Sequence, residues 1–285
     1  MPELPEVETT RRGIAPWLEG AVIAALEVRQ PALRWPIPAD LPSRVQGCQI
    51  GLLVRRSKYL ILPLQNQAAS AQAPLALLCH LGMSGSLRLV DSQAPWKKHD
   101  HYQLTLKSEV ADNPPRALRY HDPRRFGALL ACDESLEHHP LLCRLGPEPL
   151  DDAFDAAYLY QITRKSSRAI KTLIMDAHAV VGVGNIYASE ALFLAGIDPR
   201  KAAKRLSRPA CVRLVDQIKQ VLQAAIEQGG TTLKDFVGGD GKPGYFVQQL
   251  RVYGREGQPC LVCQTPLRKV VLGQRATCFC PLCQR

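Results

Sequence analysis

The chain has 285 residues, 46% of them hydrophobic, and its 36 Lys and Arg outnumber its 26 Asp and Glu to give a net charge of +10. The length suffices for two domains with cores of their own, and without a long apolar run or an export leader the sequence predicts a cytosolic rather than a membrane or secreted protein. The basic balance favours a polyanionic partner. Nucleic acid is favoured over a membrane surface because no basic amphipathic helix stands out.

The chain opens with MPELPEVETT, which predicts a helix over residues 5–18. Pro2 is small enough that aminopeptidases normally remove Met1, and a free α-amino group titrates near ~8, so part of it is nucleophilic at neutral pH. In the simpler interpretation, Pro2 is only a processing signal, Pro5 starts the helix and the glutamates favour its N-terminus. The opening segment alone leaves both interpretations open.

Short segments with period-two alternation follow the first helix and predict an antiparallel sandwich or barrel. The clearest is HYQLTLK at 101–107, where Tyr102, Leu104 and Leu106 share one face. The other predicted strands lie near residues 21–29, 49–56, 58–64, 75–80, 86–90, 116–121 and 127–132.

Two turns between these strands carry side chains that could act as fingers. HLGMSGSLR at 80–88 puts Met83 on a turn rich in glycine and serine, and DPRRFGA at 122–128 puts Arg124 and Phe126 on another. Apolar wedges on strand tips are used to unstack a duplex. Met83 could equally plug the core, and Phe126 could anchor it.

Two basic clusters lie in the same region. VRRSKYL at 54–60 contains Lys58 beside two arginines, which could meet phosphates or face water. KHDH at 98–101 contains His99 and is the densest group of histidines. Its pattern is more typical of a loop or a phosphate contact than of a metal site.

The pattern becomes helical after a linker near 133–150. SRPACVRLVDQIKQVLQAAIEQGG at 207–230 has Ser207 as a plausible cap, proline in the first turn and a glycine stop. One apolar stripe is predicted along this helix, formed by Val212, Val215, Ile218, Leu222 and Ile226.

A second helix is predicted in VVGVGNIYASEALFLAG at 180–196, with Gly182 and Gly184 ahead of an amphipathic segment. Glycines there let backbone N–H groups point at an anion, and Asn185 could cap the helix or reach a phosphate itself. An ordinary tight turn between helices is the alternative.

Half of the ten cysteines lie within residues 260–283, whereas the others are scattered, mostly in apolar stretches, where we expect buried free thiols. Two CxxC pairs separated by sixteen residues have the spacing of a structural four-cysteine zinc site, and two unrelated thiol pairs are the alternative. Such a closed zinc site folds a small module and has no open position for catalysis. Cys278 does not fit the spacing. The predicted ligands are Cys260, Cys263, Cys280 and Cys283.

Taken together, these motifs resemble one family, the formamidopyrimidine-DNA glycosylases, which repair oxidised purines. The resemblance runs in order from residue 2 to residue 283 and so covers essentially the whole chain. It rests on PELPEVET, RRSKYL, HLGMSGSLR, KHDH, DPRRFG, VVGVGNIYASE, TTLKDF…DGKPGYF and the two CxxC pairs.

The resemblance implies a bifunctional DNA glycosylase and AP lyase of base excision repair. Pro2 would attack the sugar C1′ and form a Schiff base, and β- and δ-elimination would then cleave the strand. Glu3 would protonate the sugar ring oxygen, Lys58 would bind the phosphate beside the lesion, and Glu6 would support the site. No catalytic metal or organic cofactor is implied.

The resemblance also implies how DNA is held. Met83, Arg124 and Phe126 would fill the space left by the everted nucleotide. The strand backbone would be gripped by Lys58, His99, Asn185 and, on the segment GQRAT of the zinc hairpin, Arg275. The segment 231–246 would close over the lesion, with contacts from Thr231, Thr232 and Tyr245.

Pattern and resemblance together predict an α+β multidomain protein with one structural zinc ion, acting as a monomer on duplex DNA that contains oxidised purines, in the bacterial cytosol. The fold expected is an N-terminal antiparallel β-sandwich with a leading helix, a helix–two-turn–helix domain and a zinc ribbon-like finger. The expected boundaries are 1–135 for the catalytic sandwich, 136–150 for the linker, 151–245 for the DNA-binding domain with the lesion loop, and 246–285 for the finger.

Two alternatives stay open at this point. The sister class that acts on oxidised pyrimidines shares the nucleophile, but Leu4, where that class tends to have glycine, and the segment DGKPGYF favour purines. A non-catalytic damage-binding or zinc-ribbon regulatory protein would also suit the charge and the zinc. Retention of Met1 would support that second alternative, because a blocked Pro2 cannot attack.

Overall fold

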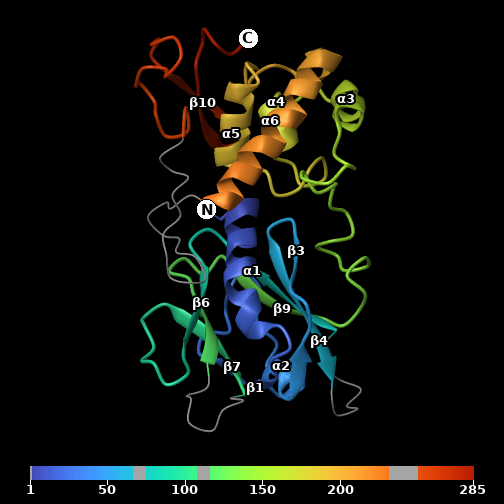
Figure 1. Cartoon of the computed structure of the whole chain (residues 1–285), viewed down its shortest axis with the longest axis vertical. Coiled ribbons are helices and arrows are strands. Elements are labelled where there is room, and N and C mark those ends of the chain that lie inside the picture. The colour runs from blue at the N-terminus through green and yellow to red at the C-terminus, as the bar shows by residue number, and fades with distance from the viewer. Residues whose placement is uncertain (1, 67–74, 108–115, 231–249) are drawn as a thin grey trace. The chain divides into compact units, whose positions relative to one another are not determined.

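A computed structural model describes residues 2–66, 75–107, 116–230 and 250–285 (Figure 1). The chain divides into two compact units, residues 1–143 with 229–245 and residues 144–228 with 246–285. The finer domain boundaries expected from the sequence stay a prediction. Within the described ranges, no helix combines the length and the apolar character needed to cross a membrane.

The first unit begins with helix α1 (Leu4–Leu18), which confirms the predicted leading helix. Glu3 is its N-cap and a proline occupies its first turn, where the missing N–H costs nothing. Its apolar side chains Leu4, Ile14 and Leu18 are completely buried. Burial of each such side chain is worth about 1.5–3 kcal/mol, so packing holds α1 against the sheets.

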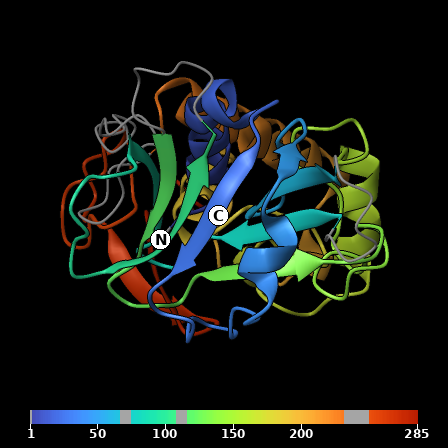
Figure 2. The same cartoon turned by 90° about the horizontal axis from the view of Figure 1, so that it is seen from below.

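Two antiparallel sheets make the predicted sandwich (Figure 2). One has the strand order β1-β7-β8-β6, and the other has the order β2-β4-β5-β9 with β3 also paired to β4. The strands are β1 (Ile23–Val28), β2 (Cys48–Ile50), β3 (Val54–Arg56), β4 (Tyr59–Asn66), β5 (Ala76–His80), β6 (Ser86–Asp91), β7 (Asp100–Leu106), β8 (Arg116–His121) and β9 (Ala128–Cys132).

The single strand expected at 49–56 is two strands, because both pair with β4 but with a shift in register. Ile50 lies opposite Leu64 and Val54 lies opposite Ile61, so the chain fits one extra residue between the two pairings. A bulge of this kind interrupts the ladder and bends the strand.

One core lies between the two sheets and α1. Its members come from both sheets, and Tyr102 of β7 stacks on Tyr120 of β8 with ring centroids 4.9 Å apart. A short helix that the sequence pattern did not suggest, α2 (Leu41–Val45), adds Leu41 and Val45 to this core.

The second unit is helical with a terminal hairpin. Its elements are α3 (Ala156–Arg164), α4 (Ile170–Ile174), α5 (Asn185–Leu194), the 3₁₀ turn η1 (Ala203–Arg205), α6 (Arg208–Glu227), β10 (Arg268–Leu272) and β11 (Arg275–Phe279). Ser207 caps α6 as predicted, its hydroxyl accepting from the amide of Ala210.

Two expectations for these helices were wrong. Val212 is 46% exposed and does not belong to the buried stripe of α6, whose first turns bury Cys211 and Leu214 instead. Helix α5 is buried along its length up to Phe193 rather than amphipathic, because it packs between α6 and β11 as well as α4.

Candidate active site and DNA-contact residues

The start of α1 carries two buried carboxyl groups next to Pro2. Glu3 and Glu6 are each 1% exposed and form a reciprocal capping box, in which the Glu3 amide donates to Glu6 Oε2 over 2.8 Å. The partial positive charge of a helix N-terminus favours negative side chains there. Pro2 is itself buried. Removal of Met1 would therefore leave the Pro2 nitrogen next to two carboxyl groups in a site largely screened from water.

Glu6 is also packed against a glycine from far along the chain. Gly230 has φ +80°, and a Cβ built there would lie 3.1 Å from Glu6 Oε1. Only glycine combines that backbone conformation with so close an approach. Gly230 is the last described residue before the predicted lesion loop, whose Thr231, Thr232 and Tyr245 lie outside the described residues.

Lys58 lies at the tip of the two-residue turn between β3 and β4. The turn needs a left-handed residue, which is Ser57 at φ +57°, and its carbonyl accepts from Arg55 Nη1 at 3.1 Å. Lys58 is half-buried. A tight turn with little backbone freedom thus fixes where the Lys58 side chain begins.

His80 lies near Lys58 and was missed by the sequence analysis, although it opens the HLGMSGSLR motif. Its ring packs on Tyr59 at 5.0 Å, and its Nδ1 accepts from the Gly82 amide at 2.9 Å. Burial, assisted by the positive charges of Lys58 and Arg34, lowers the pKa of His80 to about 4. At neutral pH the imidazole is therefore neutral, with its proton on Nε2.

The turns that carry Met83 and Phe126 are tied together by one buried carboxylate. Asp122 is 0% exposed and accepts from Ser84 Oγ at 2.6 Å, from Tyr120 Oη at 2.9 Å, and from two backbone amides of its own turn. Because Ser84 belongs to the Met83 turn, this carboxylate fixes both turns. Asp122 opens the DPRRFG motif, but the sequence analysis gave it no role, since an aspartate before proline is common in turns.

Glycines let these two turns approach. A Cβ at Gly82 would lie 2.5 Å from the amide nitrogen of Gly127, and one at Gly127 would lie 1.7 Å from Tyr120 Oη. The close fit leaves Met83 half-buried and Phe126 46% exposed, with the Arg124 guanidinium 5.0 Å from the Phe126 ring centre. Phe126 is therefore not a core anchor, which excludes that alternative.

Replacing Asp122 with asparagine should lower the free energy of unfolding by about 2–3 kcal/mol, because the new NH₂ group would face hydrogen-bond donors only. Urea unfolding measures this change. The matched control is Asp91→Asn on β6, where the carboxylate is exposed and accepts from the Gln93 amide. A loss no larger than that of the control would contradict the role given to Asp122.

His99 lies in the loop before β7, half-exposed, and its carbonyl accepts from the Asp122 amide at 3.0 Å. Its ring meets the edge of the His121 ring at 5.8 Å. The next residue, Asp100, is buried, and its carboxylate forms ion pairs with Arg88 and Arg119 and contacts the ring of His121. Burial raises the pKa of Asp100, but hydrogen bonds from the Lys97 amide and His121 outweigh it and hold the pKa below its usual range.

In the second unit, Asn185 and the segment of Arg275 are linked by Lys171. Lys171 is 1% exposed, and its Nζ donates to Asn185 Oδ1 at 2.7 Å and to Thr277 Oγ1 at 2.8 Å. Asn185 Nδ2 donates to the carbonyl of Ala276 at 3.1 Å. The Asn185 side chain thus bridges to the hairpin instead of capping α5. The sequence analysis missed Lys171 because it lies inside an apolar helix.

Arg275 follows the turn that closes the terminal hairpin. Gly273 and Gln274 have φ values of +53° and +62°, as a two-residue turn matching the strand twist requires. Arg275 is exposed at the start of β11. Its backbone is therefore well fixed while its guanidinium is accessible.

The four predicted cysteines converge at the other end of this hairpin. Their Sγ atoms all lie within 4.8 Å of one another, with Cys260 to Cys283 at 3.9 Å and Cys263 to Cys280 at 3.4 Å. Thiolates 2.3 Å from a tetrahedral zinc ion would be about 3.8 Å apart, so the set fits zinc. Beneath them lies a small core with Phe193, Val252 and Leu267. Cys278 is buried in β11 and stands outside the cluster.

The chain after the predicted lesion loop is anchored by Glu190 of α5. This buried carboxylate accepts from the backbone amides of Arg251, Val252 and Tyr253 at 2.8–3.0 Å. Burial raises the pKa of Glu190, although the three amides oppose the rise. Glu190 fixes where the chain enters the zinc module.

Comparison with known families gives three matches along the chain. Residues 1–129 match the formamidopyrimidine-DNA glycosylase N-terminal domain, residues 145–237 the H2TH domain of the same enzymes, and residues 257–285 the zinc finger found in Fpg and IleRS. These three segments include every predicted site residue except Tyr245.

Individual proteins are similar over the full length. The chain is 56% identical to the formamidopyrimidine-DNA glycosylase of Thioalkalivibrio sulfidiphilus, with 100% of both chains covered. The crystal structure of the Fpg protein of Thermus thermophilus has a TM-score of 0.84 at 38% identity, covering 99% of this chain and 98% of that one. The Lactococcus lactis Fpg in complex with Fapy-dG-containing DNA has a TM-score of 0.85 at 33% identity, covering 99% and 100%.

Proposed function

The chain belongs to the formamidopyrimidine-DNA glycosylase family, and from this premise we propose that the Pro2 nitrogen is the nucleophile that excises the damaged base. The protein is a DNA glycosylase of base excision repair. It acts on oxidised purines in double-stranded DNA and holds one structural zinc ion. The family therefore favours the catalytic, purine-specific interpretation over both alternatives raised by the sequence.

The proposed chemistry begins once Met1 has been removed. The Pro2 nitrogen bonds to C1′ of the damaged nucleotide and then loses its proton, while the bond from C1′ to the base breaks with the pair of electrons leaving on the base, which takes up a proton. Protonation of the sugar ring oxygen opens the ring and yields an iminium ion. Because a secondary amine gives this cation directly, the neighbouring C2′–H becomes acidic. Its loss expels the 3′ phosphate, and a second elimination expels the 5′ phosphate.

The observation that carries this proposal is the buried capping box beside Pro2. Glu3 is the residue next to the nucleophile, shielded from water, so a proton held on its carboxyl group can pass to the sugar oxygen. Glu6, which holds the Glu3 amide, orders the start of the helix. Lys58, at its tight turn, would bind the phosphate beside the lesion.

The remaining predicted residues would hold the DNA open. Met83, Arg124 and Phe126 lie on turns joined through Asp122, which supports a rigid insertion into the space left by the everted nucleotide. Phosphates would be bound by His99, Asn185 and Arg275, and the lesion by Thr231, Thr232 and Tyr245.

Zinc supplies no chemistry to this reaction. Bound by Cys260, Cys263, Cys280 and Cys283, it would replace the large core that the terminal module lacks. The hairpin that it stabilises carries Arg275 and the Thr277 partner of Lys171. We further propose that the enzyme works in the bacterial cytosol, where its chromosomal substrate lies, as a monomer.

The proposed function is tested with a duplex that contains 8-oxoguanine opposite cytosine, labelled at one end. β- and δ-elimination together leave phosphate at both ends of a one-nucleotide gap, and gel mobility distinguishes that product from β-elimination alone. If the base is excised but the strand with the abasic site stays uncleaved, the proposed lyase activity is refuted.

Replacing Glu3 with glutamine should slow base excision about a hundredfold, the lower range for loss of a general acid. The glutamine side chain has nearly the same shape, and its carbonyl oxygen can still accept the hydrogen bond from the backbone amide of Glu6 in the capping box. Folding should therefore change little. Single-turnover rates on the 8-oxoguanine duplex give the effect. The Glu19→Gln variant at the other end of α1 is the control, and equal rates for both variants would remove Glu3 from the proposed mechanism.

A further inference from the structure

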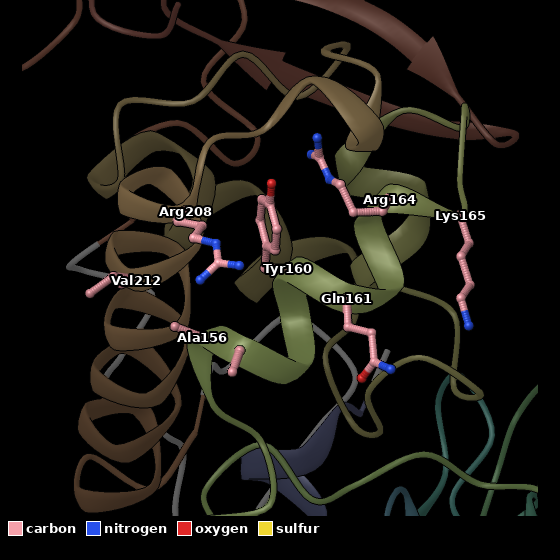
Figure 3. Close-up of a pocket in the computed structure, with 8 residues that line it drawn as sticks. Ala156, Tyr160, Gln161, Arg164, Lys165, Arg208 and Val212 are labelled. Carbon is pink, nitrogen blue, oxygen red and sulfur yellow. The ribbon is translucent and has the colours of Figure 1, made fainter.

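A pocket of about 630 Å³ opens between α3 and α6 of the second unit, and neither the proposed chemistry nor the proposed DNA contacts use it (Figure 3). Its volume lies within the range of about 300–1,000 Å³ typical of ligand sites. It is lined by Ala156, Ala157, Tyr160, Gln161, Arg164, Lys165, Arg208 and Val212.

Two cations flank the central aromatic ring of this pocket. The Arg164 and Arg208 guanidinium carbons lie 4.6 Å and 4.9 Å from the centre of the Tyr160 ring, and Figure 3 shows them on opposite sides of it. Arg164 is fixed further by donating to the carbonyl oxygens of Ala203 and Leu206. The cations are therefore held in place, and both faces of the ring are already covered.

The positive charge of the pocket is not neutralised by the chain. Arg164, Lys165 and Arg208 are its charged lining residues, and in the described ranges none of the three forms an ion pair. Helix α3 contains no acidic residue, and the carboxylate of Asp155, which precedes it, caps the helix by accepting from the Tyr158 amide.

Apart from Gln161, the rest of the pocket offers mainly apolar surface. Val212 is 46% exposed and two alanines leave room beside it. A concave apolar floor with a basic rim complements a short acidic segment that carries one bulky apolar side chain. Single-stranded DNA fits less well, because bases bind such sites by stacking on an open aromatic face and Tyr160 offers none.

We propose that this pocket, going beyond the excision reaction, binds an acidic peptide segment of a partner protein. The bulky apolar side chain of the peptide would lie against Val212 and the edge of Tyr160, and its carboxylates would pair with the three basic side chains. Within the second unit, α3 lies on the side away from the β10–β11 hairpin that carries Arg275 (Figure 1). The peptide and the proposed phosphate contacts would therefore not compete.

The test uses the full-length zinc-loaded chain and a fluorescein-labelled peptide, Asp-Glu-Asp-Glu-Leu-Phe, followed by anisotropy. We expect micromolar binding that weakens with salt. Versions with amides in place of the carboxylates, or with alanine in place of Leu-Phe, should bind at least about tenfold more weakly. Equal binding of either version would overturn the proposal.

Variants locate the binding. The double variant Lys165→Glu/Arg208→Glu, and separately Ala157→Trp, which fills the pocket without changing charge, should each weaken peptide binding at least about tenfold. The double variant Arg144→Glu/Arg268→Glu changes the net charge by the same four units at two exposed arginines that do not line the pocket, and this charge-matched control should leave peptide binding unchanged. If the pocket variants bind the peptide like the wild type, the proposal is wrong.

Competition with DNA tests whether the pocket is a DNA contact instead of a peptide site. A lesion-free duplex that displaces the peptide, together with equal loss of duplex and peptide binding in the double variant, would identify the pocket as a DNA contact and overturn the proposal. Excision of 8-oxoguanine by the pocket variants should match the wild type. If the peptide does not bind, the proposed excision reaction is unaffected. If the wild-type chain does not excise 8-oxoguanine, the proposal that the pocket binds a peptide is unaffected.

Discussion

Replacing Pro2 with glycine, which still allows removal of Met1, should lower the single-turnover rate of 8-oxoguanine excision by about three orders of magnitude or more. The variant keeps an amine but loses the secondary nitrogen, whose iminium ion carries no N–H and therefore cannot lose a proton to become a neutral imine. It also loses the pyrrolidine ring, which restricts the direction in which the nitrogen lone pair points from the start of α1. Rapid-quench assays on the labelled duplex measure the rate.

Borohydride trapping identifies the nucleophile directly. The wild-type chain should form one covalent adduct with the duplex, and peptide mapping should place it on Pro2. A chain with an extra residue ahead of Pro2 has an acylated nitrogen and should form none, while still binding a duplex with an abasic-site analogue. An adduct that maps to Lys58 in the wild type would contradict the proposed nucleophile.

Replacing Cys283 with serine should remove the zinc ion and, with it, nearly all specific DNA binding. The apparent free energy of binding of structural zinc is about 10–16 kcal/mol, whereas the core of the terminal module contains few apolar side chains. Without the ion the hairpin should unfold, and the bonds of Lys171 and Asn185 to it should be lost. We expect the affinity for abasic-analogue duplex to fall at least about a hundredfold.

Metal content by mass spectrometry and DNA binding by anisotropy check this prediction together. Cys143→Ser provides the control, because Cys143 is exposed and lies outside the cluster. Normal DNA binding by a Cys283→Ser chain that contains no zinc would show that the finger contributes nothing to the grip. Removal of zinc by a chelator should reproduce the effect of the variant.

Features with a local signal could be predicted from the sequence. Alternating strands such as 101–107, the Ser207 cap and the two CxxC pairs each depend on a few neighbouring residues, and the structure confirms them. The strand expected at 49–56 and the buried position expected for Val212 were wrong, because a bulge and the direction of helix packing are decided by contacts distant in the sequence.

Neighbouring residues in the sequence did not indicate which buried side chains hold the predicted site residues in place. Asp122, Lys171 and His80 are each defined by partners from other elements, as with Ser84 for Asp122 and Thr277 for Lys171. A lysine in an apolar helix or an aspartate before proline is unremarkable until the fold supplies those partners. The residue-level roles of Pro2 and Glu3 came from resemblance to a family, and the buried capping box now supports them with geometry.

The shared carboxylate of Asp122 also bears on how this protein can evolve. Since Ser84, Tyr120 and the 122–127 turn all donate to one group, and Gly82 and Gly127 leave no space for a side chain, neither turn can drift alone. A substitution on one turn should therefore be tolerated only with a compensating substitution on the other. The order in which the two substitutions arise then matters, because the first alone destabilises both turns. Coupling of this kind should constrain both turns together, including residues with no proposed contact to DNA.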